Sequence, residues 1–296
     1  MMKKLLAIGL LITFGFIRAS AISPYLKVAS LSGSIPEASE KVSELLTTQG
    51  YEVLGQYQPG GNPDLYVLVF TNSKLKTLSK KSEDRGMLAA AMKVGFQKSD
   101  DGITVSLLNP EYLFYGYFRE LMEETSFNSF AMEVSTEVKN SFKSLGTQME
   151  AFGGDLSVKD LMKYHYMVGM PFFDDPVELA EFESFEQGLS ILQKNLSTAS
   201  DYTVKIYEIV DKEGQVAVFG VGLPDAEKGE AHFLPIIGES HVAAMPWEII
   251  LQGNQVTMLH GRFRFALHWP ELKMKTFTKI MSSPGDVEDA MKTLVE

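Results

Sequence analysis

The 296-residue chain contains 45% hydrophobic and 22% charged residues, a composition that excludes an intrinsically disordered protein. It has no cysteine, which excludes disulfides, cysteine-ligated metals, thiol catalysis and a lipid-modified N-terminal cysteine. The net charge of −11 disfavours nucleic acids and anionic membranes as partners, unless basic residues gather on one face. The length is sufficient for two ordinary domains.

The N-terminus has the three parts of a secretory signal peptide. Lys3 and Lys4 precede the apolar segment 5–17, and residues 19–21 (Ala-Ser-Ala) form a small-x-small cleavage site. A membrane anchor is the alternative, but the apolar run is shorter than the roughly 18 residues that a span needs. We therefore predict a signal peptide over 1–21, a mature chain that begins at Ile22 without a membrane span, and a periplasmic or secreted location.

The first half of the chain predicts an α+β unit with the order strand, helix, several strands, helix. A capping box from Ser34 to Glu37 begins a helix that Gly50 ends. Apolar runs between turn residues predict strands, and apolar residues at helical spacing predict a second helix. The predicted strands are 25–31, 51–57, 66–70 and two within 90–119; the second helix covers 127–145, and 72–85 is a loop or short helix.

The second half predicts the same order again, after a boundary at Gly153-Gly154 and a short helix over 158–163. A helix begins at Ser184, and the segment 224–230 is a polar loop. The predicted strands are 164–170, 202–210, 215–221 and a hairpin from residue 243, followed by helical pieces over 276–281 and 286–295.

One stretch of the sequence occurs twice. Residues 90–92 (Ala-Ala-Met) align without a gap on 243–245, and Ile103-Thr104 then aligns on Val256-Thr257. Both copies are interpreted as two strands joined by a polar turn, and two unrelated hairpins are the alternative. We predict a duplication, with one unit over 22–150 and a related unit over 151–296. The two units should pack as an intramolecular pseudo-dimer, so that the protein is a monomer in solution.

The repeated stretches resemble the domain of unknown function 302. In the first copy the motifs are Phe70-Thr-Asn72, Ala90-Ala-Met92, Asp101-Gly102, Val105-Ser106 and Asn109-Pro-Glu-Tyr-Leu113. The second copy has Ala243-Ala-Met-Pro246, with the proline that Lys93 replaces in the first; the cysteine that often follows this proline is Trp247 here. The resemblance implies two diverged copies of a TATA-binding-protein-like fold that pairs as a dimer. It implies no activity.

The sequence contains no established catalytic, cofactor or metal motif. All five histidines lie in the second half, and none forms the i, i+4 pair of a helical zinc site. The carboxylates of Asp174-Asp175 and of Glu181 and Glu183 are interpreted as solvated. We predict no catalytic residue, no metal and no cofactor.

One row of basic side chains is the candidate site. If the residues after the second turn continue as a strand, their alternation places His260, Arg262, Arg264 and His268 on one face. These four residues could bind an anionic ligand, and the affinity would then rise as the histidines become protonated. The alternative is a row that is solvated or paired with acidic residues of a neighbouring strand.

These features favour a non-catalytic binding or interaction module of the cell envelope. The first alternative is a small-molecule-binding enzyme or sensor that holds an anionic ligand between the two units, and the second is a purely structural envelope protein. A pocket at the unit interface lined by the basic row would favour the ligand, and a filled interface would favour the interaction module.

Overall fold

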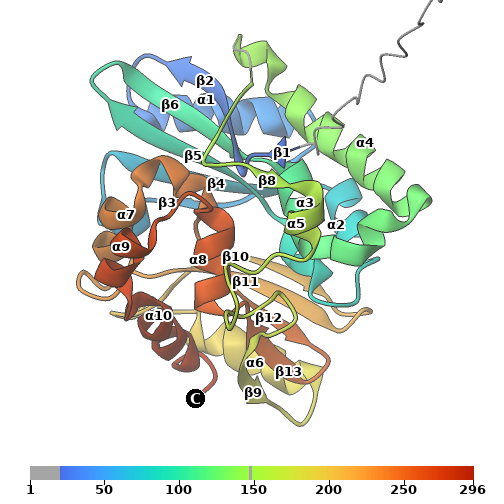
Figure 1. The fold of residues 1–296 in the computed structure, drawn as a ribbon. Coiled ribbons are helices and arrows are strands. Elements are labelled where there is room, and N and C mark those ends of the chain that lie inside the picture. The colour runs from blue at the N-terminus through green and yellow to red at the C-terminus, as the bar shows by residue number, and fades with distance from the viewer. Residues whose placement is uncertain (1–20, 147–148) are drawn as a thin grey trace, which may run out of the picture.

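The computed structural model describes residues 21–146 and 149–296, so the predicted signal peptide lies outside the described residues except for Ala21. Two antiparallel sheets lie one above the other, and helices flank each of them (Figure 1). Among the described residues, no helix has the length and apolar character needed to cross a membrane.

The first unit contains a six-stranded sheet. Its elements are β2 (Tyr25–Leu31), α1 (Ile35–Thr48), β3 (Glu52–Tyr57), β4 (Leu65–Thr71), α2 (Ser73–Ser79), the 3-10 helix η2 (Gly86–Ala90), β5 (Met92–Ser99), β6 (Gly102–Leu108), α3 (Pro110–Phe118), α4 (Thr125–Ser141) and β7 (Glu150–Phe152). The strand order is β3-β4-β5-β6-β2-β7. Because β7 pairs with β2, the first sheet includes residues on both sides of the boundary expected at 150.

The second unit contains a five-stranded sheet. Its elements are α5 (Val158–Met162), β9 (Val177–Glu181), α6 (Phe185–Asn195), β10 (Val204–Asp211), β11 (Val216–Gly222), α7 (Glu230–Ile237), the 3-10 helix η5 (Glu239–Ala244), β12 (Trp247–Gln252), β13 (Gln255–Met258), α8 (Gly261–His268), α9 (Met274–Phe277), the 3-10 helix η6 (Thr278–Ile280) and α10 (Ser283–Lys292). The strand order is β10-β11-β12-β13-β9. A small ribbon of β1 (Ala21–Ile22) and β8 (Leu156–Ser157) completes the strands of the described residues.

The two large sheets have the same topology. Without β7, the first sheet has the order β3-β4-β5-β6-β2, and the second repeats it element for element as β10-β11-β12-β13-β9. A helix follows the first strand of each unit, and another follows each hairpin. The predicted fold class, two related α+β units that form a pseudo-dimer, is therefore confirmed.

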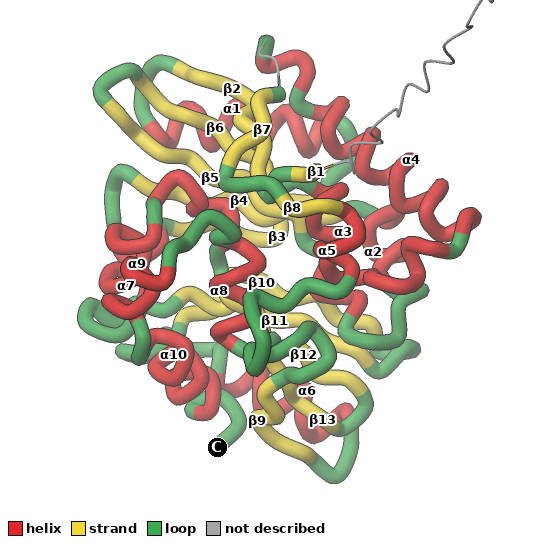
Figure 2. The backbone as a smooth tube through the Cα atoms, viewed as in Figure 1, coloured by secondary structure: helices red, strands yellow, loops and turns green. Residues whose placement is uncertain are grey.

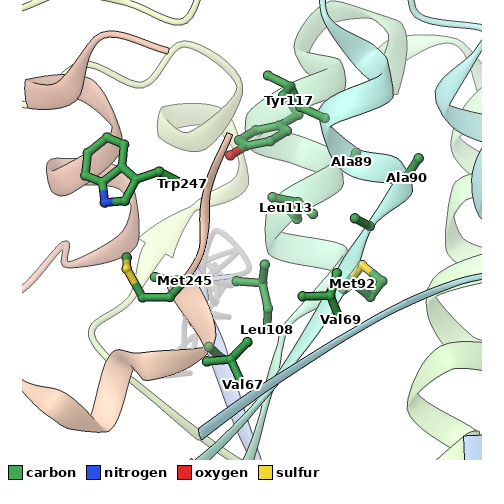
Figure 3. Packing of buried hydrophobic residues seen from close by; sticks show 14 of the residues in the cluster. Val67, Val69, Ala89, Ala90, Met92, Leu108, Leu113, Tyr117, Met245 and Trp247 are labelled. Carbon is green, nitrogen blue, oxygen red and sulfur yellow. The ribbon is translucent and has the colours of Figure 1, made fainter. Parts of the chain in front are cut away.

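Each unit packs its matching 3-10 helix, η2 or η5, on the sheet of the other unit. The second unit's η5 packs on β4, β5 and β6, while η2 of the first unit packs on β11 and β12. Such a reciprocal contact is the geometry of an isologous dimer interface. Gly95 makes the approach possible, because a Cβ there would lie 2.6 Å from Cγ1 of Val242 and 2.8 Å from the amide nitrogen of Ala243. Met245 and Trp247 of the second unit belong to the same buried cluster as Val67 and Leu108 of the first (Figure 3).

Two strand predictions were wrong. Residues 164–170 lie in a loop, and the matching strand is β9, farther along the chain. This apolar run packs on α8 instead of joining the sheet, and a short apolar run does not distinguish these outcomes. We call residues 163–176 the strap; it runs as a loop between α5 and β9 (Figure 2).

The second error concerns the residues after each hairpin, which form α3 and α8 instead of a continued strand. The side chain of His260 caps α8 by accepting a hydrogen bond from the Arg262 amide (3.1 Å), as Asn109 caps α3. All residues of α8 except Arg262 are buried. A helix buried on nearly all sides has no amphipathic periodicity, and its sequence can therefore imitate an alternating strand.

Candidate functional site

The helix α8 lies between the two sheets (Figure 1), and tyrosines close its C-terminal end. The hydroxyl groups of Tyr25, Tyr112 and Tyr164 donate to three successive carbonyl oxygens at this end, those of His268 (2.9 Å), Leu267 (2.7 Å) and Ala266 (2.8 Å). These oxygens have no partner within the helix, so the tyrosines satisfy them without water. Two of the tyrosines belong to the first unit, and the unit interface is filled around the end of α8.

Arg264 belongs to a buried charge cluster in this interface. Its guanidinium donates to the Ala244 and Pro246 carbonyls (2.6 Å each) and to Glu248 (3.1 Å). Lys93 of the first unit makes an ion pair with the same carboxylate. Burial lowers the pKa of Lys93, and the attraction of Glu248 opposes that shift. The cluster thus joins two cations to one carboxylate across the units.

His268 lies beside this cluster and not in a ligand site. Its Nε2 is 3.4 Å from the hydroxyl oxygen of Tyr117, and its side chain is buried. Burial lowers the pKa of His268 well below the usual value, and the positive charges of Arg264 and Lys93 add to the effect. The imidazole is therefore neutral at pH 7.

The structure thus separates the four residues of the predicted basic row. Arg264 and His268 are buried in the interface, His260 caps the helix, and Arg262 alone is exposed. Burial lowers the pKa of His260, and the charge of Arg262 lowers it further. Any gain of positive charge on His260 therefore requires a lower pH than an ordinary histidine needs. The assumption of a shared strand face was wrong, because residues 260–268 are helical.

Arg262 lines an apolar cavity of about 230 Å³ that opens to the surface. The walls come from the strap, from α8 and from the segment 269–281 that contains α9. The lining residues are Tyr166, Met167, Met170, Arg262, Ala266, Trp269, Leu272, Met274, Phe277 and Met281. Four of these ten residues are methionines, and the guanidinium is the only charged group among them.

The strap wall of this cavity is fixed by Phe173. This buried ring lies 5.1 Å from the guanidinium carbon of Arg85 and 4.8 Å from that of Arg119, both measured to the ring centroid. Cations over an aromatic face are attracted by the ring quadrupole. Phe173 also contacts the ring of Phe263 in α8 at 5.9 Å. The strap is therefore held against both units.

Sequence reasoning missed this cavity because its walls are about 100 residues apart in the chain. The strap was interpreted as a strand of the second sheet, which would have placed its methionines far from α9. One signal was present: Met274, Phe277 and Met281 have the spacing of one helical face, in a segment with few other apolar residues. Within residues 21–146 and 149–296, no group of three or more His, Asp or Glu side chains could hold a metal ion.

Comparison with known proteins gives a likeness to solved structures and none to a family model or a curated protein. No family model matches the chain. No curated protein matches it either. Among solved structures, the chain is similar to the crystal structure of the uncharacterized conserved protein DUF302 from Bacillus stearothermophilus, with a TM-score of 0.33 and 14% sequence identity. The match covers 40% of this chain and 96% of the other.

Proposed function

We propose that the chain is a non-catalytic binding protein whose ligand is an amphipathic carboxylic acid, an apolar chain with one anionic end. The apolar chain would occupy the cavity beneath the strap, and the carboxylate would lie on Arg262. The observation that carries this proposal is the combination in one cavity of methionine walls with a single, exposed cation.

The chemistry of the lining supports this class of ligand. A guanidinium presents paired donors that match the two oxygens of a carboxylate. Among the described residues, Arg262 makes no ion pair with a protein carboxylate, so its charge is available to a ligand. Methionine side chains are flexible and polarizable, and they adapt to apolar groups of different shape.

The position of the cavity differs from the one expected from the sequence. An anionic ligand between the two units would need the space that Lys93, Glu248 and Arg264 fill, whereas the cavity lies beside α8 within the second unit. We further propose that both units descend from one domain of the family with unknown function 302, that the protein is exported, and that it acts as a monomer in the cell envelope. The common strand order supports the first of these proposals, and the pattern of residues 1–21 supports export.

Isothermal titration calorimetry with octanoate and octan-1-ol tests the ligand class. Arg262→Gln should weaken octanoate binding about tenfold, because a charge-assisted hydrogen bond is lost, and should leave octan-1-ol unchanged. Met281→Ser should weaken both, and Lys212→Gln, which removes one positive charge from an exposed residue outside the cavity lining, should change neither. In a series of longer fatty acids, each added CH₂ should tighten binding by up to about fourfold until the cavity is full.

Two outcomes would contradict the proposal. Wild-type protein that binds neither octanoate nor its homologues has no such site. Binding of octanoate that Arg262→Gln and Met281→Ser leave unchanged takes place elsewhere on the protein.

A further inference from the structure

Exposed apolar side chains line the cavity or lie next to its lining residues in the strap. Val168 of the strap is 97% exposed and Met167 is 47% exposed; across the cavity, Met274 is 45% and Met281 58% exposed. Six large apolar side chains are exposed in the described part of the chain. Five of them lie on the strap or beside the cavity: the four just named and Phe172 of the strap. Concentration of such groups at one place marks an interaction surface, whereas single exposed apolar residues are ordinary.

Lysines lie next to these apolar groups. Lys273, Lys275 and Lys279 are exposed and belong to the same short segment as Met274 and Met281. The segment 270–281 has three lysines and one glutamate, in a chain whose net charge is −11. None of the three lysines makes an ion pair with another described residue. With Arg262 inside the mouth, this is a local concentration of free positive charge on an acidic protein.

We propose that this surface, formed by Met167, Val168, Met274, Met281 and the three lysines, docks on an anionic lipid bilayer. The apolar side chains would enter the boundary between headgroups and acyl chains, and the lysines would contact the anionic headgroups. The cavity mouth then faces the bilayer. This inference concerns the surface and does not depend on which ligand fills the cavity.

Charge complementarity favours a bilayer over other occupants. The acidic remainder of the protein does not prevent docking, because charges farther than a Debye length of about 8–10 Å are screened at physiological salt. A second copy of the chain would bring the same lysines against each other and would be repelled. An acidic protein segment would suit the lysines but would leave the tip of the strap, with Val168 almost fully exposed, without a partner.

Vesicle flotation with the full-length mature protein tests the proposal. Vesicles of equal parts phosphatidylglycerol and phosphatidylethanolamine should bind the protein, phosphatidylcholine vesicles should bind it weakly, and high salt should release it. The triple variant Lys273→Gln, Lys275→Gln, Lys279→Gln should lose about 100-fold in affinity, which is about fivefold for each lysine. The matched control is Lys41→Gln, Lys98→Gln, Lys212→Gln, which removes the same charge from three exposed lysines elsewhere and should bind normally.

A second arm tests the apolar contribution. The double variant Val168→Ser, Met281→Ser keeps every charge and should lose about tenfold in affinity for the anionic vesicles. The proposal is overturned if this variant binds vesicles as the wild type does. It is also overturned if soluble polyglutamate binds as tightly as the vesicles, because the surface then recognises an acidic polymer. It is also overturned if both triple variants lose the same affinity, or if sedimentation equilibrium shows a dimer that the double variant abolishes.

Discussion

Glu230 provides a sensitive test of how the two units pack. It is the first residue of α7 and is buried, with 1% of its surface exposed. Two groups of the first unit hold its carboxyl group: the hydroxyl of Tyr57 donates to Oε1 (2.8 Å), and the amide of Gly60 donates to Oε2 (3.0 Å). Burial raises the pKa of Glu230 to about 7, although these two hydrogen bonds act in the opposite direction.

The raised pKa of Glu230 determines both the sign and the size of the effect of pH on the free energy of unfolding. The folded state binds the proton more tightly than the unfolded state, so the free energy of unfolding falls as the pH rises from 4.5, the usual pKa, through about 7. The difference of about 2.5 pKa units corresponds to about 3 kcal/mol once Glu230 is ionised in both states. A glutamine has the shape and the neutrality of the protonated carboxyl group. It can accept from Gly60 and donate to the hydroxyl oxygen of Tyr57.

We therefore expect Glu230→Gln to stabilise the protein by up to about 3 kcal/mol near pH ~8 and to change little near pH ~5. Urea unfolding at both pH values measures this difference from the midpoints, provided that the slope stays the same. Glu40→Gln, an exposed position on α1, is the control and should be neutral at both pH values. A variant destabilised equally at the two pH values would show that Glu230 is ionised throughout and that its raised pKa is wrong.

Two further predictions concern the interface and export. Glu248→Gln should destabilise the protein by about 3–5 kcal/mol in urea unfolding, because Lys93 and Arg264 then remain as buried cations without a carboxylate; a loss below about 1 kcal/mol would mean that the three groups do not act as a cluster. N-terminal sequencing of the protein purified from its own cells should begin at Ile22, and an intact Met1 in the soluble fraction would exclude the export prediction.

Local signals in the sequence predicted the first unit well. The strand 25–31 and the capping box of Ser34 and Glu37 are confirmed, because turn residues and caps act within a few positions of the chain. The repeated topology could also be predicted, since the order of elements and the Ala-Ala-Met motif can be recognised without knowledge of side-chain contacts. The helix α7 was missed because residues 230–237 include Pro235 and carry apolar side chains with little periodicity.

The candidate site could be predicted only in part. Arg262 was named from the sequence, but the interpretation that grouped it with Arg264 and His268 assumed a strand. Arg264 and His268 differ from Arg262 in being buried, and this burial depends on the packing of α8 against the first unit, which no local pattern specifies. The methionine walls depend on the path of the strap, which is held through Phe173 by arginines of the first unit. Long-range contacts of this kind leave little trace in a single sequence.

Comparison of α3 with α8 explains why the cavity lies in the second unit. Aligned on their caps, Asn109 and His260, the two helices place Tyr117 opposite His268, and these two side chains touch each other as expected near a pseudo-two-fold axis. The same alignment matches Glu111 with Arg262.

In the first unit, α4 packs on α3, and Lys139 of α4 makes an ion pair with Glu111 at 3.1 Å. In the second unit, the strap and the segment around α9 lie beside the matching position of α8, and they leave the methionine-lined cavity open at Arg262. The two units thus differ at this position: the first has a closed helix face with a paired carboxylate, and the second has a free cation at a cavity. The first unit then serves as the rigid support, since Arg85 and Arg119 hold the strap and Lys93 holds Glu248. All walls of the cavity belong to the second unit, so binding would reside there, and the first unit would contribute only by holding the strap in place.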